Sequence, residues 1–120
     1  MTINENKRKY DLEDRTYNFA KNCRDLIYKL SRNIPNIENS KQLMRSSGSV
    51  AANYIEANEA LSKKDFIMRI KICRKEAKES RLWLRLCLTE NAELDKTRTE
   101  LTKEAEEITK IYGAILEKCK

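Results

Sequence analysis

The residues of this chain whose types and spacing could do chemistry are basic, and they lie in one segment. Residues 63–88 contain nine Lys or Arg and three Asp or Glu, whereas the rest of the 120 residues carries sixteen of each sign. The net charge of +6 at pH 7 therefore belongs to this segment. Such a concentration of positive charge indicates a surface for an anionic partner rather than a generic solubilising surface.

Six of these basic residues follow one another at spacings of seven, three, four, three and four. On a helix these spacings place the side chains on one flank, where they form a basic stripe roughly 30 Å long. Lys and Arg side chains in such a row can neutralise successive phosphates, which predicts binding of RNA or DNA mainly through phosphate contacts. The alternative is a solvated face whose charges pair with the acidic residues of 100–107. The basic stripe consists of Lys64, Lys71, Arg74, Lys78, Arg81 and Arg85.

At the end of the stripe, a short helical segment carries apolar side chains on nearly all of its sides. Within residues 82–88, Leu82, Trp83 and Leu86 face away from the expected core side. A helix that is apolar on every side must be buried on every side, so either the first helix covers these residues or another subunit does. We favour another subunit, because Trp is enriched at protein interfaces. These three residues are the predicted oligomer interface.

Residues that could catalyse a reaction or hold a metal are sparse. Histidine is absent, and with it the commonest general base near neutral pH and the commonest metal ligand. The four cysteines lie 50, 14 and 32 residues apart, so no Cys-x-x-Cys motif exists, and we expect each of them to be buried as a small apolar side chain. We therefore expect no enzyme, no catalytic residue, and no metal or cofactor site.

Three polar residues stand out before the basic segment: Arg45, Asn53 and Glu56. A carboxylate in this setting could be catalytic, but no nucleophile, metal partner or phosphate-binding loop accompanies it. We expect these side chains to join a hydrogen-bonded network within the fold instead.

Four amphipathic helices must position all of these residues. Apolar residues recur every three to four positions, and the chain has only two Gly and one Pro, which is typical of an all-helical protein. Four such helices with short connections predict a single domain over residues 1–120, an antiparallel up-down four-helix bundle. The predicted helices span about residues 13–32, 40–60, 63–90 and 97–118.

The predicted helix ends depend on local signals. Pro35 is expected to stop the first helix, since the residue before a proline is pushed out of the helical region. The second helix is expected to begin at a cap formed by Asn39 or Ser40. Ser62 and Thr97 are the expected caps of the third and fourth helices, because an acidic residue follows each of them three positions later.

The second predicted helix carries an apolar stripe and a run of small side chains. The stripe extends to Leu61, which is therefore expected in the core. The small residues surround Gly48, and small residues allow a neighbouring helix to approach closely. We expect Gly48 to serve such packing.

Three stretches of the chain form distinctive motifs. They lie at residues 10–13 (YDLE), 43–57 (LMRSSGSVAANYIEA) and 62–66 (SKKDF), and the second is the most specific. Together they resemble the bacterial "four helix bundle protein" family, which includes proteins encoded in intervening sequences of 23S ribosomal RNA genes. That family is similar to the accessory variability determinants of diversity-generating retroelements. The resemblance runs from about residue 10 to residue 84, and the chain departs from it at Ala57, where many members have glycine.

The resemblance implies an assembly and a class of function. It implies that the four-helix protomers form a ring-like homo-oligomer, with a pentamer favoured, and that the protein is a nucleic-acid or ribonucleoprotein accessory rather than an enzyme. The alternative is a protein-interaction scaffold whose basic flank docks an acidic partner protein, such as a reverse transcriptase. The chain has neither an apolar run of membrane-spanning length nor a signal peptide pattern, so we expect a cytoplasmic protein that does not bind membranes.

Overall fold

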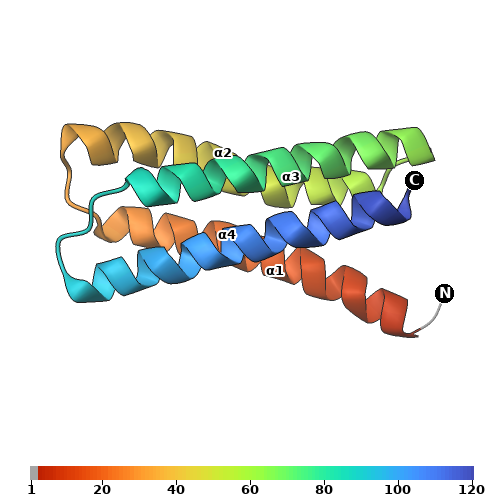
Figure 1. Cartoon of the computed structure of the whole chain (residues 1–120), viewed down its shortest axis with the longest axis horizontal. Coiled ribbons are helices and arrows are strands. Elements are labelled where there is room, and N and C mark those ends of the chain that lie inside the picture. Colours follow the sequence, from red (N-terminus) through yellow and green to blue (C-terminus); the bar gives the residue numbers. More distant parts are fainter. Residues whose placement is uncertain (1–2) are drawn as a thin grey trace.

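Four long helices and no other regular element make up the part of the chain described by this computed structural model, which covers residues 3–120 and the side chains from residue 12 onward. Successive helices run in opposite directions (Figure 1). Each helix packs against its neighbours in the chain, and the first also packs against the last. This confirms the predicted all-α fold and helix order. The helices are α1 (Ile3–Lys29), α2 (Ile34–Asn58), α3 (Lys63–Leu86) and α4 (Ala92–Lys118).

The start of α2 differs from the predicted one. Pro35 lies in the first turn of α2, where its missing N–H would have no partner within the helix in any case. Asn33 is the N-cap, and its side chain accepts a backbone N–H of that turn at 2.9 Å. The expected cap at Asn39 or Ser40 is therefore wrong. The segment that stops α1 also begins α2.

The predicted N-cap is confirmed for α3 and wrong for α4. Ser62 caps α3, and its hydroxyl oxygen accepts the backbone N–H of Asp65 at 3.1 Å. Asn91 caps α4 by accepting a first-turn N–H at 2.9 Å, so the expected cap at Thr97 lies inside the helix. α3 ends at Leu86 rather than near residue 90, and the residues between Leu86 and Asn91 form the connection.

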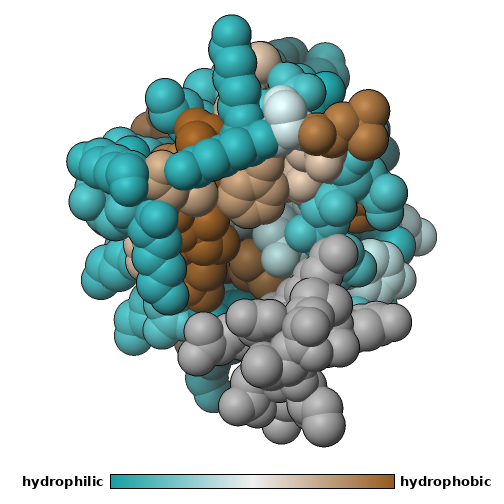
Figure 2. All heavy atoms as spheres, turned by 90° about the vertical axis from the view of Figure 1, so that its right-hand side faces the viewer, coloured by the Kyte–Doolittle hydropathy of each residue, from teal (hydrophilic) through white to brown (hydrophobic). Residues whose placement is uncertain are grey.

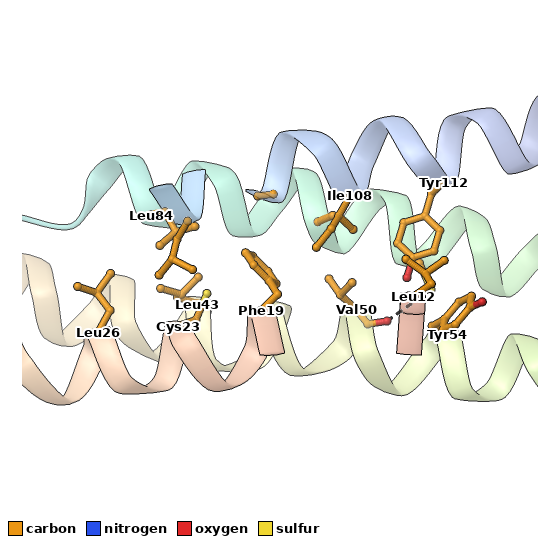
Figure 3. Close-up of a cluster of buried hydrophobic side chains, with 14 of the residues drawn as sticks. Leu12, Phe19, Cys23, Leu26, Leu43, Val50, Tyr54, Leu84, Ile108 and Tyr112 are labelled. Atoms are coloured by element: carbon orange, nitrogen blue, oxygen red, sulfur yellow. Dashed lines mark hydrogen bonds between the residues drawn. The ribbon is translucent and has the colours of Figure 1, made fainter. Parts of the chain in front are cut away.

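The core residues expected from helical spacing are buried in all four helices. On α3, the series that steps by three and four residues is fully buried from Ile70 to Cys87. Figure 3 shows Phe19 of α1, Val50 of α2 and Ile108 of α4 pointing toward one another between the helices. Leu61 is the clearest exception, since α2 ends before it and its side chain is 99% exposed. Phe66 and Cys119 were also expected in the core and are half-buried.

Small side chains bring α2 and α3 together at one buried position. The hydroxyls of Ser46 and Ser80 lie 2.8 Å apart, and both residues are buried. Gly48 takes no part in this contact, because it is exposed and a Cβ placed on it would meet nothing within 4 Å. The expectation that Gly48 serves packing between helices of one chain is wrong.

The cysteines lie in or beside the core. Cys23, Cys73 and Cys87 are buried and Cys119 is half-buried, all as free thiols. Burial raises the pKa of Cys23 to about 12 and that of Cys73 to about 11, so both thiols stay protonated at neutral pH. Within residues 3–120 no helix has a stretch that is long and apolar enough to cross a membrane.

Candidate nucleic-acid interface

The basic stripe lies on the flank of α3 that borders α4. Two contacts establish this position. Arg81 Nε donates to Glu106 Oε1 at 2.7 Å, and Arg74 Nε lies 3.8 Å from the point where a Cβ on Gly113 would stand. Because α3 and α4 run side by side in opposite directions (Figure 1), these two contacts align the stripe along α4.

The stripe side chains are mostly open to solvent. Five of the six residues are exposed, and Arg81 is half-buried. Among the side chains from residue 12 onward, Arg81 is the stripe residue that pairs with a carboxylate. Glu104 and Glu107, which could have neutralised the stripe, pair instead with Arg15 of α1, and the Arg15–Glu104 distance is 2.6 Å. The acidic residues of α4 therefore neutralise the stripe at one position.

Two acidic residues of α3, Glu76 and Glu79, are directed toward α2, away from the stripe. Glu76 is buried, and its carboxylate accepts a hydrogen bond from Arg45 at 3.2 Å. Nearby, Arg69 donates to Asn53 Oδ1 at 2.9 Å. The expected network within the bundle thus includes Arg45 and Asn53, whereas Glu56 is exposed and makes no hydrogen bond within the described side chains. The two glutamates of α3 therefore pair on its α2 side, where Arg69 also lies, and leave the stripe without a carboxylate from its own helix within ion-pair distance.

α4 adds a basic row that the sequence analysis did not identify. Arg98 and Lys103 line an open hollow of about 360 Å³ together with Arg85 of the stripe. Lys110 follows Lys103 by seven residues on the same side of α4 and is exposed. The signal in the sequence is the seven-residue recurrence of Lys96, Lys103 and Lys110, which is obscured by the acidic residues between them. We name the basic stripe together with Arg98, Lys103 and Lys110 the α3–α4 basic face.

Between the two basic rows, the side chains that α4 presents are small and mostly uncharged. Thr102, Thr109 and Gly113 are half-buried there. The hydroxyls of Thr102 and Thr109 donate to carbonyls of their own helix at 2.8 and 2.7 Å. Glu106 lies among them but is paired with Arg81. The α3–α4 basic face therefore has basic edges on either side of a nearly neutral strip.

At the start of α3 the basic residues surround a small apolar area. Lys63, Lys64 and Lys71 line a shallow hollow together with Ile67 and Met68. Figure 2 faces this end of the bundle and shows hydrophilic side chains standing around patches of apolar surface. Lys64 and Lys71 of the stripe thus border apolar side chains rather than carboxylates.

The predicted interface residues lie near the other end of α3. Leu82 and Leu86 are 45% and 47% exposed, and Trp83 is half-buried. Leu82 and Leu86 are therefore not covered by the first helix, and over the described residues no Cα of α1 lies within 8 Å of a Cα of α3. The indole N–H of Trp83 is buried and has no acceptor within the described part of the chain. Leu88, 54% exposed, extends this apolar patch beyond the helix end.

A protein-family model and a solved structure match this chain over most of its length. The family model of the 23S rRNA-intervening sequence protein matches residues 12–114, a range that includes the whole α3–α4 basic face. Among solved structures, the chain is similar to a protein of unknown function from the S23 ribosomal protein family of Bacteroides thetaiotaomicron. The two share 28% sequence identity and a TM-score of 0.73, over 88% of this chain and 97% of that one. No curated protein matches the chain.

Proposed function

This chain belongs to the 23S rRNA-intervening sequence protein family, and from that premise we propose that it is a non-enzymatic accessory protein that binds RNA or DNA through the α3–α4 basic face. The observation that carries the proposal is that the stripe on α3 is exposed and largely unpaired. The buried carboxylate of α3, Glu76, pairs toward α2, while five of the six stripe residues are exposed on the α4 flank. That arrangement leaves a row of cations open to an external polyanion.

The chemistry of this surface suits phosphates better than base edges. Lys side chains act as point charges toward phosphate, and Arg side chains can donate two parallel hydrogen bonds to one phosphate. Phosphate contacts carry no sequence information, so binding with little sequence preference follows. Each neutralised phosphate releases condensed counterions, which makes the affinity depend on salt.

The experiment that tests this proposal is a salt titration of binding to unrelated RNA and DNA oligonucleotides, followed by fluorescence anisotropy. If four to six stripe residues engage, log affinity falls linearly with log salt with a slope of magnitude about 3 to 5. Oligonucleotides of the same length and unrelated sequence give similar slopes. The absence of binding at low salt would overturn the proposal and favour a scaffold that docks an acidic protein.

We also propose that the protein is a homo-oligomer whose protomers meet at Leu82, Trp83 and Leu86. The supporting observation is that the apolar side chains of Leu82 and Leu86 are about half exposed on the surface of the single chain. A second copy of the chain could bury both of them. A closed ring follows if this patch meets a different surface of the next protomer and the rotation between successive protomers closes. Five copies are favoured by the family resemblance.

A further inference from the structure

The hollow between the end of α3 and the first half of α4 brings cations from two helices together. Arg85 reaches it from α3, whereas Arg98 and Lys103 reach it from α4. The complete lining is Arg85, Arg98, Thr99, Thr102, Lys103 and Glu106.

Arg98 is held in place at this hollow by two hydrogen bonds. Nη1 donates to the backbone carbonyl of Cys87 at 2.8 Å, and Nη2 donates to Asp95 Oδ1 at 2.6 Å. The Arg98 side chain is only 25% exposed. A guanidinium has five N–H donors, so three of them remain available after these two bonds. Arg98 therefore offers donors from a side chain that is already ordered.

The hollow keeps a positive charge after its internal pairs are counted. The carboxylate of Glu106 is engaged by Arg81, at 2.7 Å, and Asp95 is engaged by Arg98. Arg85 and Lys103 are both exposed, and neither has a carboxylate within ion-pair distance among the described side chains. Two unpaired cations on opposite helices thus flank one ordered guanidinium.

We propose that this hollow is a seat for one phosphate group. Arg85 and Lys103 approach the phosphate from the two helices, and Arg98 donates from below them. The inference rests on the proposed function in that the phosphate belongs to a nucleic-acid strand, which the seat anchors at one end of the basic stripe. A free phosphate ester offers the same chemistry, so the test has one arm for each source.

The first arm uses inorganic phosphate alone and the full chain. Phosphate is titrated at low ionic strength while backbone amide shifts are followed by NMR. The expected result is a saturable shift change around residues 98–103 that is lost in the Arg85→Gln/Lys103→Gln double variant. The matched control is Lys21→Gln/Arg24→Gln, which removes the same charge from exposed residues of α1 outside the hollow and keeps the shift change. Unsaturable shifts, or equal shifts in both variants, would overturn the seat.

The second arm measures oligonucleotide affinity against salt for the same variants. If the seat holds a strand phosphate, the Arg85→Gln/Lys103→Gln variant lowers the magnitude of the salt slope by up to about 2, and the control leaves it unchanged. A lost phosphate response with an unchanged slope would support the seat and overturn its role for the strand. Wild-type protein that binds phosphate but no nucleic acid would overturn the proposed function and leave the seat standing.

Discussion

A single buried carboxylate shows how charge is sorted at the residue scale. Glu76 is 3% exposed, and two cations lie near it, Arg45 at 3.2 Å and Lys75 at 3.4 Å. A buried charge without a partner is strongly unfavourable, so the contact with Arg45 stabilises the packing of α2 on α3. The same contact keeps this carboxylate away from the basic stripe.

Replacing Arg45 tests that role. Arg45→Ala removes a partner from a buried carboxylate, and we expect the free energy of unfolding to fall by about 1–3 kcal/mol. The matched control is Arg24→Ala, because Arg24 pairs with Asp25 and both side chains are about half exposed. Exposed pairs contribute about 0–1 kcal/mol, so the control should change little. Urea unfolding measures both, and equal losses would contradict the assigned role of Arg45.

At the element scale, helix periodicity could be read from the sequence more reliably than helix ends. The buried series from Ile70 to Cys87 was predictable because its spacing is regular over the whole helix. The start of α2 was not predictable in this way. The Asn33–Pro35 segment can end one helix or begin the next, and only packing decides between the two. The start of α4 was missed because Asn91 and Thr97 both fit a cap pattern.

For the candidate site too, positions set within one helix were predictable from the sequence, and positions set by packing between helices were not. The stripe could be predicted, because its spacing on α3 is set within one helix. The basic row on α4 could not be predicted, because the packing of two helices determines which flank of α4 faces α3. Arg81–Glu106 and Arg74–Gly113 are contacts between helices, and no local pattern specifies them. Gly48 was misjudged for the same reason, since its surroundings are set by tertiary packing.

Two substitutions test whether Asn91 is the N-cap of α4. Asn91→Ala removes the side chain that accepts a first-turn N–H and should destabilise the protein by about 1 kcal/mol. Thr97→Ala lies within the helix, where Ala is the better helix former, and should leave stability unchanged or slightly raised. Urea unfolding of the two variants checks this. A larger loss for Thr97→Ala than for Asn91→Ala would contradict the assigned start.

At the scale of the whole molecule, the two proposed binding surfaces lie on different flanks of α3. The α3–α4 basic face borders α4, whereas the side chains of Leu82, Trp83 and Leu86 are not part of the lining of the hollow beside α4. An assembly built through the apolar patch can therefore leave the basic face open. Several basic faces in one assembly would also bind one polyanion together, with a higher overall affinity than a single face.

The proposed assembly can be tested by light scattering. We expect wild-type protein at micromolar concentration to give a mass several times the 14.1 kDa of one chain. Leu86→Asp should shift the protein toward monomer, because a carboxylate buried at an interface without a partner is unfavourable. Leu61→Asp is the matched control, since Leu61 is 99% exposed and lies outside the patch. A monomeric wild-type protein would refute the assembly.

If nucleic acid binds to the basic stripe, the position of the positive charge, rather than its amount, determines the affinity. The most direct measurement compares two quadruple Gln variants that lose the same charge, both checked for retained helicity by circular dichroism. One changes Lys71, Arg74, Lys78 and Arg85 of the stripe, and the other changes Lys21, Arg24, Lys29 and Arg32 on and just after α1.

Oligonucleotide affinity is then measured against salt for both variants and the parent. We expect the stripe variant to bind weakly, with a salt slope reduced in magnitude by about 3 to 4, and the α1 variant to retain most of the parent's affinity and slope. Equal losses in the two variants, or a stripe variant that binds like the parent, would contradict this expectation.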